Sequence, residues 1–421
     1  MRRDVVVIGA GLIGTTTAWY LAERGFNVTV LDRREGPGLE TSFANGALLT
    51  PSEADPWNAP GTLARLMRWL GREDSPLLLR PRALPGMLGW GLKFLLASRP
   101  VPHLRSTIAN LRLALYSMKS LDILDQKLSL NYNHLHNGTL KIFRDNNALD
   151  HSWKLAEELR HLGLESSLLT LSEVLEMEPK LDGISGQLVG AVYYPGDGSG
   201  DAYRFTCEMH THALAAGVKF IFNTSVNDIY ARNSHIRALH TGLGDITADS
   251  YVLAAGSYSP QLMRLLGLKL PIYPVKGYSV TIESTSNHGL RIPLVDFEQK
   301  IVIAPLGNKL RIAGTAEFNG YDKSLNPERG ANILRQAIRI LPQLSESSDH
   351  GQVTHWAGLR PMTCDGPPIL GVSAYKNLYF NTGHGPLGWT LCAGSARCVA
   401  DKIAGLEPDI DLTAYRYDRS I

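Results

Sequence analysis

The sequence is poor in cysteine and in long apolar runs, and it carries almost no net charge. Its four cysteines form no Cys-x-x-Cys pair, which argues against a disulfide framework or a zinc ribbon and favours a reducing, cytoplasmic setting. No uncharged apolar run reaches the length of about 18 residues that a membrane-spanning helix needs. The formal net charge of +2 gives no reason to expect nucleic acid as a partner.

The chain is nevertheless apolar enough, and long enough, for more than one core. Hydrophobic residues make up 44% of its 421 residues and charged residues 19%, which is the composition of a globular protein. A chain of this length is typical of about two domains. Small molecules are therefore the expected class of ligand.

The first 32 residues carry the clearest motif. Residues 4–8, DVVVI, are a nearly continuous β-branched run that is typical of a buried parallel strand. Gly9, Gly11 and Gly14 follow as Gly-x-Gly-x-x-Gly at the start of a predicted helix, and Asp32 ends the next predicted strand. Such a turn lets the backbone approach a pyrophosphate, and the acidic residue can accept hydrogen bonds from ribose hydroxyls. We predict a bound dinucleotide, with NAD and FAD both compatible.

The segment after Asp32 favours the more extended of these two cofactors. It is polar and rich in glycine where another helix could have followed, and it includes Thr41, Ser42, Asn45 and Gly46. Hydroxyl, amide and backbone N–H groups of this kind can hold a diphosphate or the edge of a flavin. An ordinary surface loop is the alternative interpretation of these residues.

A second block of sequence predicts a different kind of sheet. Residues 270–284 and 300–318 are predicted strands, the latter a pair joined by a Gly-Asn turn at Gly307 and Asn308. Helices are expected at residues 107–130 and 151–162. An antiparallel sheet of this type belongs to another domain than the parallel sheet at the start of the chain.

Two histidine pairs raise the question of a metal site. His134 and His136 are separated by two positions, as are His210 and His212. On a helix this spacing points the side chains to different faces, and no acidic or cysteine ligands stand next to them in the sequence. We therefore expect no metal site.

Residues 84–97, LPGMLGWGLKFLLA, are apolar and follow the basic pieces RLMRWLGR and LLLRPR. A stretch of this character can lie on a membrane surface. A helix packed on the protein's own core is the alternative.

Taken together, these segments resemble a known family. The stretches VVVIGAGLIGTTTAWYLAERGFNVTVLDR, LETSFANGALLTPSEADPWNAPG, YPVKGYSVTI, WAGLRPMTCDGPPILG and NTGHGPLGWTLCAGSARCVADKI are similar, in one order, to the bacterial FAD-dependent D-amino acid dehydrogenases. These belong to the broader group of D-amino acid oxidases, glycine oxidases and sarcosine oxidases.

The resemblance implies an α/β fold in which a Rossmann-type, doubly wound FAD-binding domain is joined to a substrate domain with a mixed or antiparallel sheet. The expected FAD-binding domain is discontinuous and comprises residues 1–50, 180–260 and 355–421. The expected substrate domain comprises residues 51–179 and 261–354, with residues 84–97 as its membrane-docking segment.

The resemblance also assigns the cofactor contacts. The loop at residues 381–390, NTGHGPLGWT, would fold under the flavin and direct the amino terminus of the last helix at its pyrimidine end, where negative charge develops. Val226 matches a strand that touches adenine, and Asp32 stands where many relatives have glutamate. The expected FAD-binding residues are Gly9, Gly11, Leu12, Ile13, Gly14, Asp32, Arg33, Thr41, Ser42, Asn45, Gly46, Val226, Ala255, Gly256, Gly358, Gly383, Gly385, Leu387, Gly388, Trp389 and Thr390.

Three residues are expected to act on the substrate. Arg360, in GLRP, matches the arginine that pairs with the substrate carboxylate in the glycine oxidase branch, and a guanidinium offers that carboxylate a planar fork. Tyr278 is a candidate for a second contact, with a plain core aromatic as the alternative. His384 is expected to tune the flavin or hold substrate, or else to be structural. Gly385 and Phe297 replace residues that contact substrate in that branch.

The activity implied is oxidation of a D-amino acid, by hydride transfer to FAD, to a 2-oxo acid and ammonia. A quinone or another respiratory acceptor would take the electrons, which suits a cytoplasmic enzyme with peripheral membrane contact. A dehydrogenase for D-proline or D-hydroxyproline is the nearest alternative. An NAD-dependent dehydrogenase and a non-catalytic nucleotide sensor are alternatives from other classes.

Overall fold

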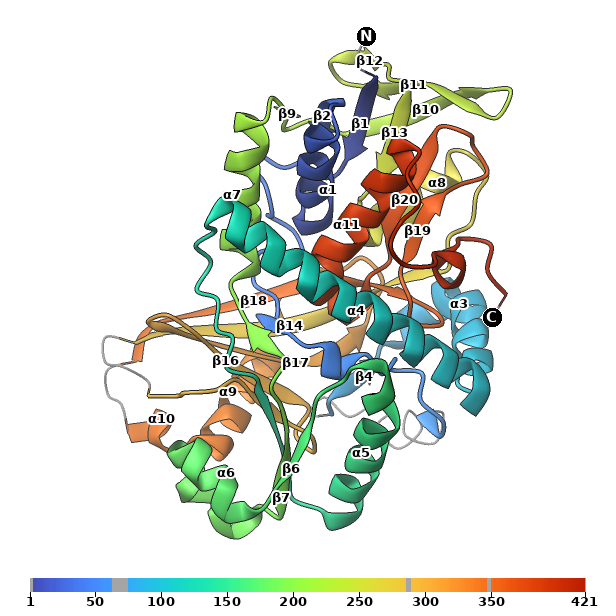
Figure 1. The fold of residues 1–421 in the computed structure, drawn as a ribbon. Helices are drawn as coiled ribbons and strands as arrows, with labels where there is room; N and C mark the ends of the chain where they lie inside the picture. Colours follow the sequence, from blue (N-terminus) through green and yellow to red (C-terminus); the bar gives the residue numbers. More distant parts are fainter. Residues whose placement is uncertain (1–2, 63–74, 285–288, 347–349, 421) are drawn as a thin grey trace.

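The architecture is built on two large sheets, with helices packed on and between them (Figure 1). The structure, a computed structural model, describes residues 3–62, 75–284, 289–346 and 350–420. A three-stranded antiparallel sheet covers one side of the first large sheet. It consists of β10 (Val226–Arg232), β11 (His235–Thr241) and β12 (Gly244–Ile246).

The first large sheet has six strands in the order β19-β20-β13-β1-β2-β9, all parallel except β19. Its strands are β1 (Asp4–Ile8), β2 (Asn27–Leu31), β9 (Lys219–Ile221), β13 (Ser250–Leu253), β19 (Ile369–Val372) and β20 (Leu378–Thr382). In β1, Val5 and Val7 enter one buried core while Val6 and Ile8 enter another. The β-branched run is therefore explained by a strand that is buried on both faces.

Four helices cover one face of this sheet (Figure 1). They are α1 (Leu12–Glu23), α4 (Pro100–Leu128), α7 (Ala202–Ala215) and α11 (Gly388–Ala404). The short α8 (Ser259–Arg264) packs on the other face with the three-stranded sheet. Helix α1 ends where Gly25 takes a left-handed conformation, with φ at 81°, the usual way for glycine to end a helix.

The second large sheet has nine strands and is mostly antiparallel. Its order is β18-β14-β17-β16-β15-β5-β7-β6, with β4 paired to β17, and the β15–β5 and β4–β17 pairs are parallel. The strands are β4 (Leu77–Leu79), β5 (Thr139–Phe143), β6 (Ser167–Leu169), β7 (Gly190–Tyr194), β14 (Ile272–Ser284), β15 (Leu294–Asp296), β16 (Ile301–Leu306), β17 (Lys309–Phe318) and β18 (His350–Thr363). A separate two-stranded antiparallel sheet consists of the short β3 (Leu48–Leu49) and β8 (Gly198–Ser199).

In the described part of the chain, five more helices lie around the second sheet. They are α3 (Leu84–Ala97), α5 (Asn146–Leu159), α6 (Leu171–Met177), α9 (Pro327–Ile340) and α10 (Gln343–Glu346). Helix α4 belongs to both regions, because Leu113 and Leu121 pack in the core under the first sheet while Leu111 packs with α5 and β7. The expected α/β fold, a doubly wound parallel sheet with a second mixed sheet, is confirmed.

The division of the chain into two domains remains a proposal. Strands β7 and β18 pair within the nine-stranded sheet, although most of their residues fall in ranges that we assigned to the FAD-binding domain. If sheet membership defines the domains, the boundaries near residues 180 and 355 move toward the carboxyl terminus. Both shifts arise from long-range strand pairing that no local pattern reveals.

Two helix starts differ from the sequence prediction. Helix α4 begins at Pro100, seven residues before the expected start at residue 107, and α5 begins at Asn146 instead of residue 151. Proline is well suited to the first position of a helix, because it has no N–H that needs a partner there and its φ is already helical. Asp145 caps α5 by accepting a hydrogen bond from the Ala148 N–H at 2.9 Å.

Candidate active site

A continuous cavity of about 1150 Å³ extends from the glycine turn after β1 to strands β14, β17 and β18 of the second sheet. This volume is slightly above the range of roughly 300–1,000 Å³ that is usual for small-molecule sites. It leaves room for a dinucleotide and a substrate together. The walls are mostly apolar side chains with a few convergent polar groups, as in other small-molecule sites.

The three glycines of the first turn have different structural roles. Gly9 has φ at 113°, and a Cβ there would lie 2.6 Å from the carbonyl oxygen of Ala254. A Cβ on Gly14 would lie 1.9 Å from the Gly9 oxygen, so this residue allows the turn and α1 to pack. A Cβ on Gly11 would meet only Ser42 Oγ at 3.6 Å, and Gly11 lines the cavity. Gly11 therefore keeps the cavity open where a diphosphate would approach the backbone.

The amino terminus of α1 faces this opening without a side-chain cap. Its first N–H groups point along the helix axis, and together with the helix dipole they favour a negative group at that place. The Leu12 N–H donates to Ser42 Oγ at 3.0 Å. The turn and the uncapped helix fit the diphosphate of a dinucleotide such as FAD.

Asp32, at the end of β2, is tied into the glycine turn. Its Oδ2 accepts a hydrogen bond from the Ala10 N–H at 2.6 Å, and its Oδ1 accepts one from the Arg34 N–H at 2.8 Å. Burial raises the pKa of Asp32 above its ordinary value, while these backbone bonds oppose that shift. Each oxygen keeps a further lone pair, which is what a ribose hydroxyl requires. The neighbouring Arg33 lies 3.7 Å over the ring of Tyr258.

The segment at residues 41–46 connects the two sheets. The Thr41 hydroxyl donates to the Leu359 carbonyl oxygen at 2.7 Å, on β18. Asn45 Oδ1 accepts a hydrogen bond from the Ala47 N–H at 2.9 Å, and the Asn45 carbonyl oxygen accepts one from Arg311 at 2.8 Å. These bonds hold the segment along the wall of the cavity, where the sequence predicted a cofactor contact.

Most of the predicted cofactor residues line this one cavity. Those that line it are Gly9, Gly11, Leu12, Ile13, Asp32, Arg33, Thr41, Ser42, Asn45, Gly46, Val226, Ala255, Gly256, Gly358, Gly385, Leu387, Gly388 and Trp389. Gly14, Gly383 and Thr390 do not line it. Gly383 packs against Thr363, and the Thr390 hydroxyl oxygen accepts a hydrogen bond from the Thr50 N–H at 2.9 Å. Gly14 would therefore act through the packing of the first turn on α1, and Gly383 and Thr390 through the shape of the loop before α11.

The loop before α11 is folded by two glycines in the left-handed region. Gly383 has φ at 81° and Gly385 has φ at 55°. A Cβ on Gly383 would lie 2.8 Å from Thr363 Cγ2, so the loop also packs too closely on β18 for a larger residue. Helix α11 begins at Gly388 without a side-chain cap. Its amino terminus lines the cavity and can stabilise negative charge there.

His384 lines the cavity, and its ring is held by a hydrogen bond to a residue of α11. Its Nε2 shares a hydrogen bond of 3.0 Å with the hydroxyl of Ser395, inside α11. Burial lowers the pKa of His384 to about 3, so the imidazole is neutral at physiological pH. It can orient groups by hydrogen bonding, but it does not supply a positive charge.

Arg360, on β18, places a partly buried cation in the wall of the cavity. Its Nη1 donates to the Thr315 carbonyl oxygen at 3.2 Å, and its guanidinium lies 5.4 Å from the ring centre of Trp57. A Cβ on Gly277 would lie 2.2 Å from Nη1, so that glycine makes room for the guanidinium. Burial lowers the pKa of Arg360 to about 10, and the group remains protonated at neutral pH. Among the residues that the structure describes, no carboxylate forms an ion pair with it.

Tyr278 also lines the cavity, but its hydroxyl already donates its proton in a hydrogen bond within the protein. The hydroxyl donates to Glu317 Oε2 at 2.5 Å, and Glu317 in turn receives Arg80 Nε at 2.8 Å. Burial, followed by the hydrogen bond to Glu317, raises the pKa of Tyr278 above its ordinary value. The tyrosine therefore stays neutral. A second contact to a substrate carboxylate through this hydroxyl remains a prediction.

The structure adds cavity residues that the sequence did not single out. Trp57 lies over Arg360, and Lys141 forms an ion pair with Glu53, with Nζ 2.6 Å from Oε1. Trp57, Lys141 and Glu53 all line the cavity. Glu53 and Lys141 are 88 positions apart, so no local spacing could have paired them.

Comparisons with known proteins agree with this geometry. A family model described as FAD dependent oxidoreductase matches residues 4–402. A D-amino acid dehydrogenase of Paramagnetospirillum magneticum is 45% identical over 418 residues, which cover 99% of this chain and 98% of that protein. A D-amino acid dehydrogenase of Dechloromonas aromatica is 45% identical over 411 residues, covering 96% of this chain and 98% of that protein.

Solved structures show the same fold. The glycine oxidase of Geobacillus kaustophilus matches with a TM-score of 0.77 and 26% identity, covering 100% of this chain and 99% of that one. The L-proline dehydrogenase of P. horikoshii matches with a TM-score of 0.78 and 20% identity, covering 99% of this chain and 97% of that one. At 20% identity the second likeness concerns the fold alone.

Proposed function

The chain belongs to the FAD-dependent oxidoreductase family, and on this premise we propose that it is a D-amino acid dehydrogenase. It oxidises the C–N bond of a D-amino acid to an imine, and water converts the imine to a 2-oxo acid and ammonia. Two D-amino acid dehydrogenases are each 45% identical to this chain, and the match covers nearly their whole length. FAD, when bound, supplies the two-electron acceptor.

The observation that carries the proposal is the partly buried guanidinium of Arg360, which lines the cavity without an ion-pair partner among the described residues. It faces the cavity with a single carbonyl hydrogen bond, to Thr315, and no carboxylate pairs with it in the described part of the chain. A buried cation is stable only with a compensating anion. The substrate carboxylate is the group that fits, because guanidinium binds carboxylate through two parallel hydrogen bonds.

The rest of the cavity positions the substrate and excludes water. Trp57 packs over the guanidinium, and neutral His384 provides a hydrogen-bonding group without a competing charge. The uncapped amino termini of α1 and α11 supply backbone N–H groups for the negative parts of the cofactor. Rate enhancement then comes mainly from positioning and preoriented dipoles.

A turnover panel tests the proposal and its nearest alternative. The purified yellow holoenzyme should reduce an artificial dye with D-alanine, and its flavin absorption should bleach when D-alanine is added without an acceptor. Turnover with D-proline or cis-4-hydroxy-D-proline alone would move the assignment to a cyclic secondary amine. Bleaching with L-alanine but not D-alanine would overturn it.

We also propose that electrons leave through a membrane quinone and that α3 is the docking surface. Trp90 and Phe94 of α3 are buried against the second sheet, whereas Leu88 and Leu92 are 68% and 63% exposed. The helix therefore packs with one face and presents leucines on the other, with Lys93 exposed beside them. Such an apolar face with a basic residue is typical of helices that lie on a membrane. No helix in the described ranges is long and apolar enough to cross a bilayer.

The Leu88→Glu/Leu92→Glu double variant should lose binding to anionic lipid vesicles by about tenfold or more, because two exposed apolar side chains are replaced by charges that anionic lipid repels. FAD content and dye reduction should stay as in the parent protein. Leu243→Glu, at a residue that is 72% exposed on the three-stranded sheet, is the matched control. Equal sedimentation of all three proteins with vesicles would rule out α3 as the docking surface.

A further inference from the structure

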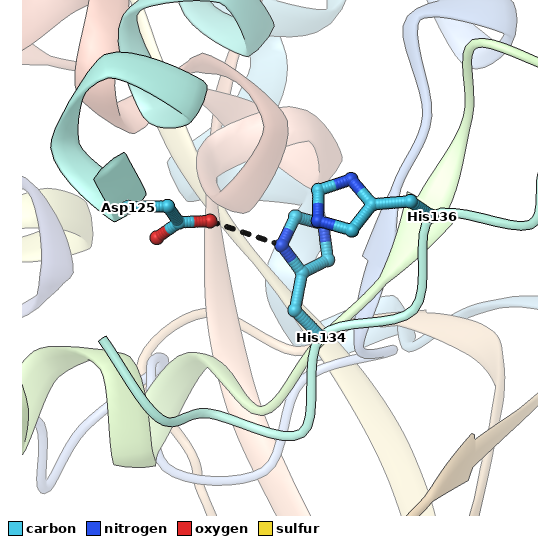
Figure 2. Close-up of side chains that lie close together, drawn as sticks. All are labelled: Asp125, His134 and His136. Atoms are coloured by element: carbon cyan, nitrogen blue, oxygen red, sulfur yellow. Dashed lines mark hydrogen bonds and ion pairs between the residues drawn. The ribbon is translucent and has the colours of Figure 1, made fainter. Parts of the chain in front are cut away.

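Asp125, His134 and His136 form a cluster of possible metal ligands outside the cavity (Figure 2). Asp125 lies in the last turn of α4, and the histidines lie in the connection from α4 to β5. This connection is not a helix: Leu135 pairs with Ser199 in a β-bridge. Side chains two positions apart in extended chain point to the same side. The expectation that the histidines face apart assumed a helix, and the fold removes that assumption.

We propose that these three residues bind a divalent transition-metal ion such as Zn²⁺. One ligand atom from each residue lies within 4.8 Å of the others. Asp125 Oδ2 and His134 Nδ1 are 3.1 Å apart, close to the edge of roughly 3.3 Å that follows from bonds of about 2.0–2.2 Å in a tetrahedral site. His136 has to move closer, and it is an exposed side chain whose ring centre is 3.5 Å from that of His134.

The cluster contains more acceptor atoms than the chain supplies with donors. The Tyr132 hydroxyl donates to Asp125 Oδ2 at 2.5 Å and lies 2.6 Å from His134 Nδ1. His134 Nε2 and Asp125 Oδ1 are buried and have no hydrogen-bond partner among the described residues. No lysine or arginine of the described chain pairs with Asp125. A cation would supply positive charge to these two buried atoms and to the partly buried carboxylate beside them.

The ligand chemistry selects the class of ion. Two imidazoles and one carboxylate suit zinc and its neighbours in the first transition row, whereas calcium and magnesium prefer oxygen ligands alone. Water would complete a four-coordinate site. The Tyr132 hydroxyl would then fix the orientation of the liganding carboxylate through its hydrogen bond.

The ion would stabilise the wall of the FAD cavity from behind. The Tyr132 ring packs edge-on against Trp389, with ring centres 5.6 Å apart, and Trp389 lines the cavity. The Trp389 Nε1–H donates to the Gly200 carbonyl oxygen at 2.9 Å, and the next residue, Asp201, donates its N–H to the Tyr132 carbonyl oxygen at 2.7 Å. Binding at the cluster would therefore increase thermal stability without contact to the substrate.

The test is a zinc titration of the FAD-loaded, full-length protein after dialysis against a chelator. We expect one equivalent of zinc per chain and a higher unfolding temperature in zinc. His136→Ala should weaken zinc binding at least tenfold with FAD content unchanged, because this side chain is exposed. His240→Ala is the matched control: His240 pairs with Asp245 at an exposed site outside the cluster, and its loss should leave zinc affinity unchanged.

Two results would overturn the proposal. One is a zinc titration that fails to depend on the cluster, with the same result for the His136→Ala and parent proteins. The cluster would then be a hydrogen-bonded network of Tyr132, Asp125 and His134 without an ion. The other is an anomalous-scattering peak at the zinc edge that lies away from the cluster in a zinc-soaked crystal, whereas a peak between the three side chains supports the site.

Discussion

Arg360→Ala should raise the KM for D-alanine by a factor of about 30 or more while FAD stays bound. Removing one partner of a buried charge pair costs roughly 2–5 kcal/mol, which corresponds to a factor of about 30 to several thousand. Arg360 is partly buried in the cavity wall, and its one described hydrogen bond is to the backbone carbonyl of Thr315. The variant should therefore lose affinity for the carboxylate of the substrate. Steady-state kinetics with a dye acceptor, together with the flavin spectrum, measure both quantities.

Two comparisons separate binding of the carboxylate from loss of structure. Arg360→Lys keeps the charge but not the fork, so it should recover part of the lost affinity. D-alaninamide has no carboxylate, so the parent and Arg360→Ala proteins should handle it with similar KM values. An Arg360→Ala protein that oxidises D-alanine with the parent's KM would exclude this residue as the carboxylate partner.

Gly11→Val should yield a folded, colourless protein with FAD affinity reduced at least a hundredfold. Gly11 has φ at −74° and ψ at −178°, an extended conformation that valine also adopts. A Cβ there comes no closer to the rest of the protein than 3.6 Å, at Ser42 Oγ. The added side chain fills the space through which the diphosphate reaches the backbone. The ratio of flavin to protein absorbance after gel filtration, with circular dichroism for the fold, measures the effect.

Two other glycines serve as controls for this variant. Gly91→Ala, in α3, should keep full FAD content, because no atom lies within 4 Å of the added Cβ. Gly14→Ala should lower stability itself, because its Cβ would lie 1.9 Å from the Gly9 oxygen. A yellow Gly11→Val protein with the parent's FAD content would refute the assignment of the turn to the cofactor.

Much of the local structure was predictable from the sequence. The strand at residues 4–8 has the predicted bounds, and α1 begins at Leu12, directly after the glycine turn. The predicted turn at Gly307 and Asn308 joins β16 and β17. These features depend on residues close together in the chain, where β-branched runs, glycine turns and helical periodicity give a direct signal.

The sequence by itself thus determined the nucleotide-binding turn, the two kinds of sheet and most of the residues that line the cavity. Only the tertiary structure decided that Trp57 lies over Arg360, that Lys141 pairs with Glu53, and that His134 and His136 face Asp125. Each of these depends on contacts between distant segments or on the conformation of a connecting segment. Local propensity does not encode such contacts, because they form only when whole sheets and helices pack and bury their apolar faces together.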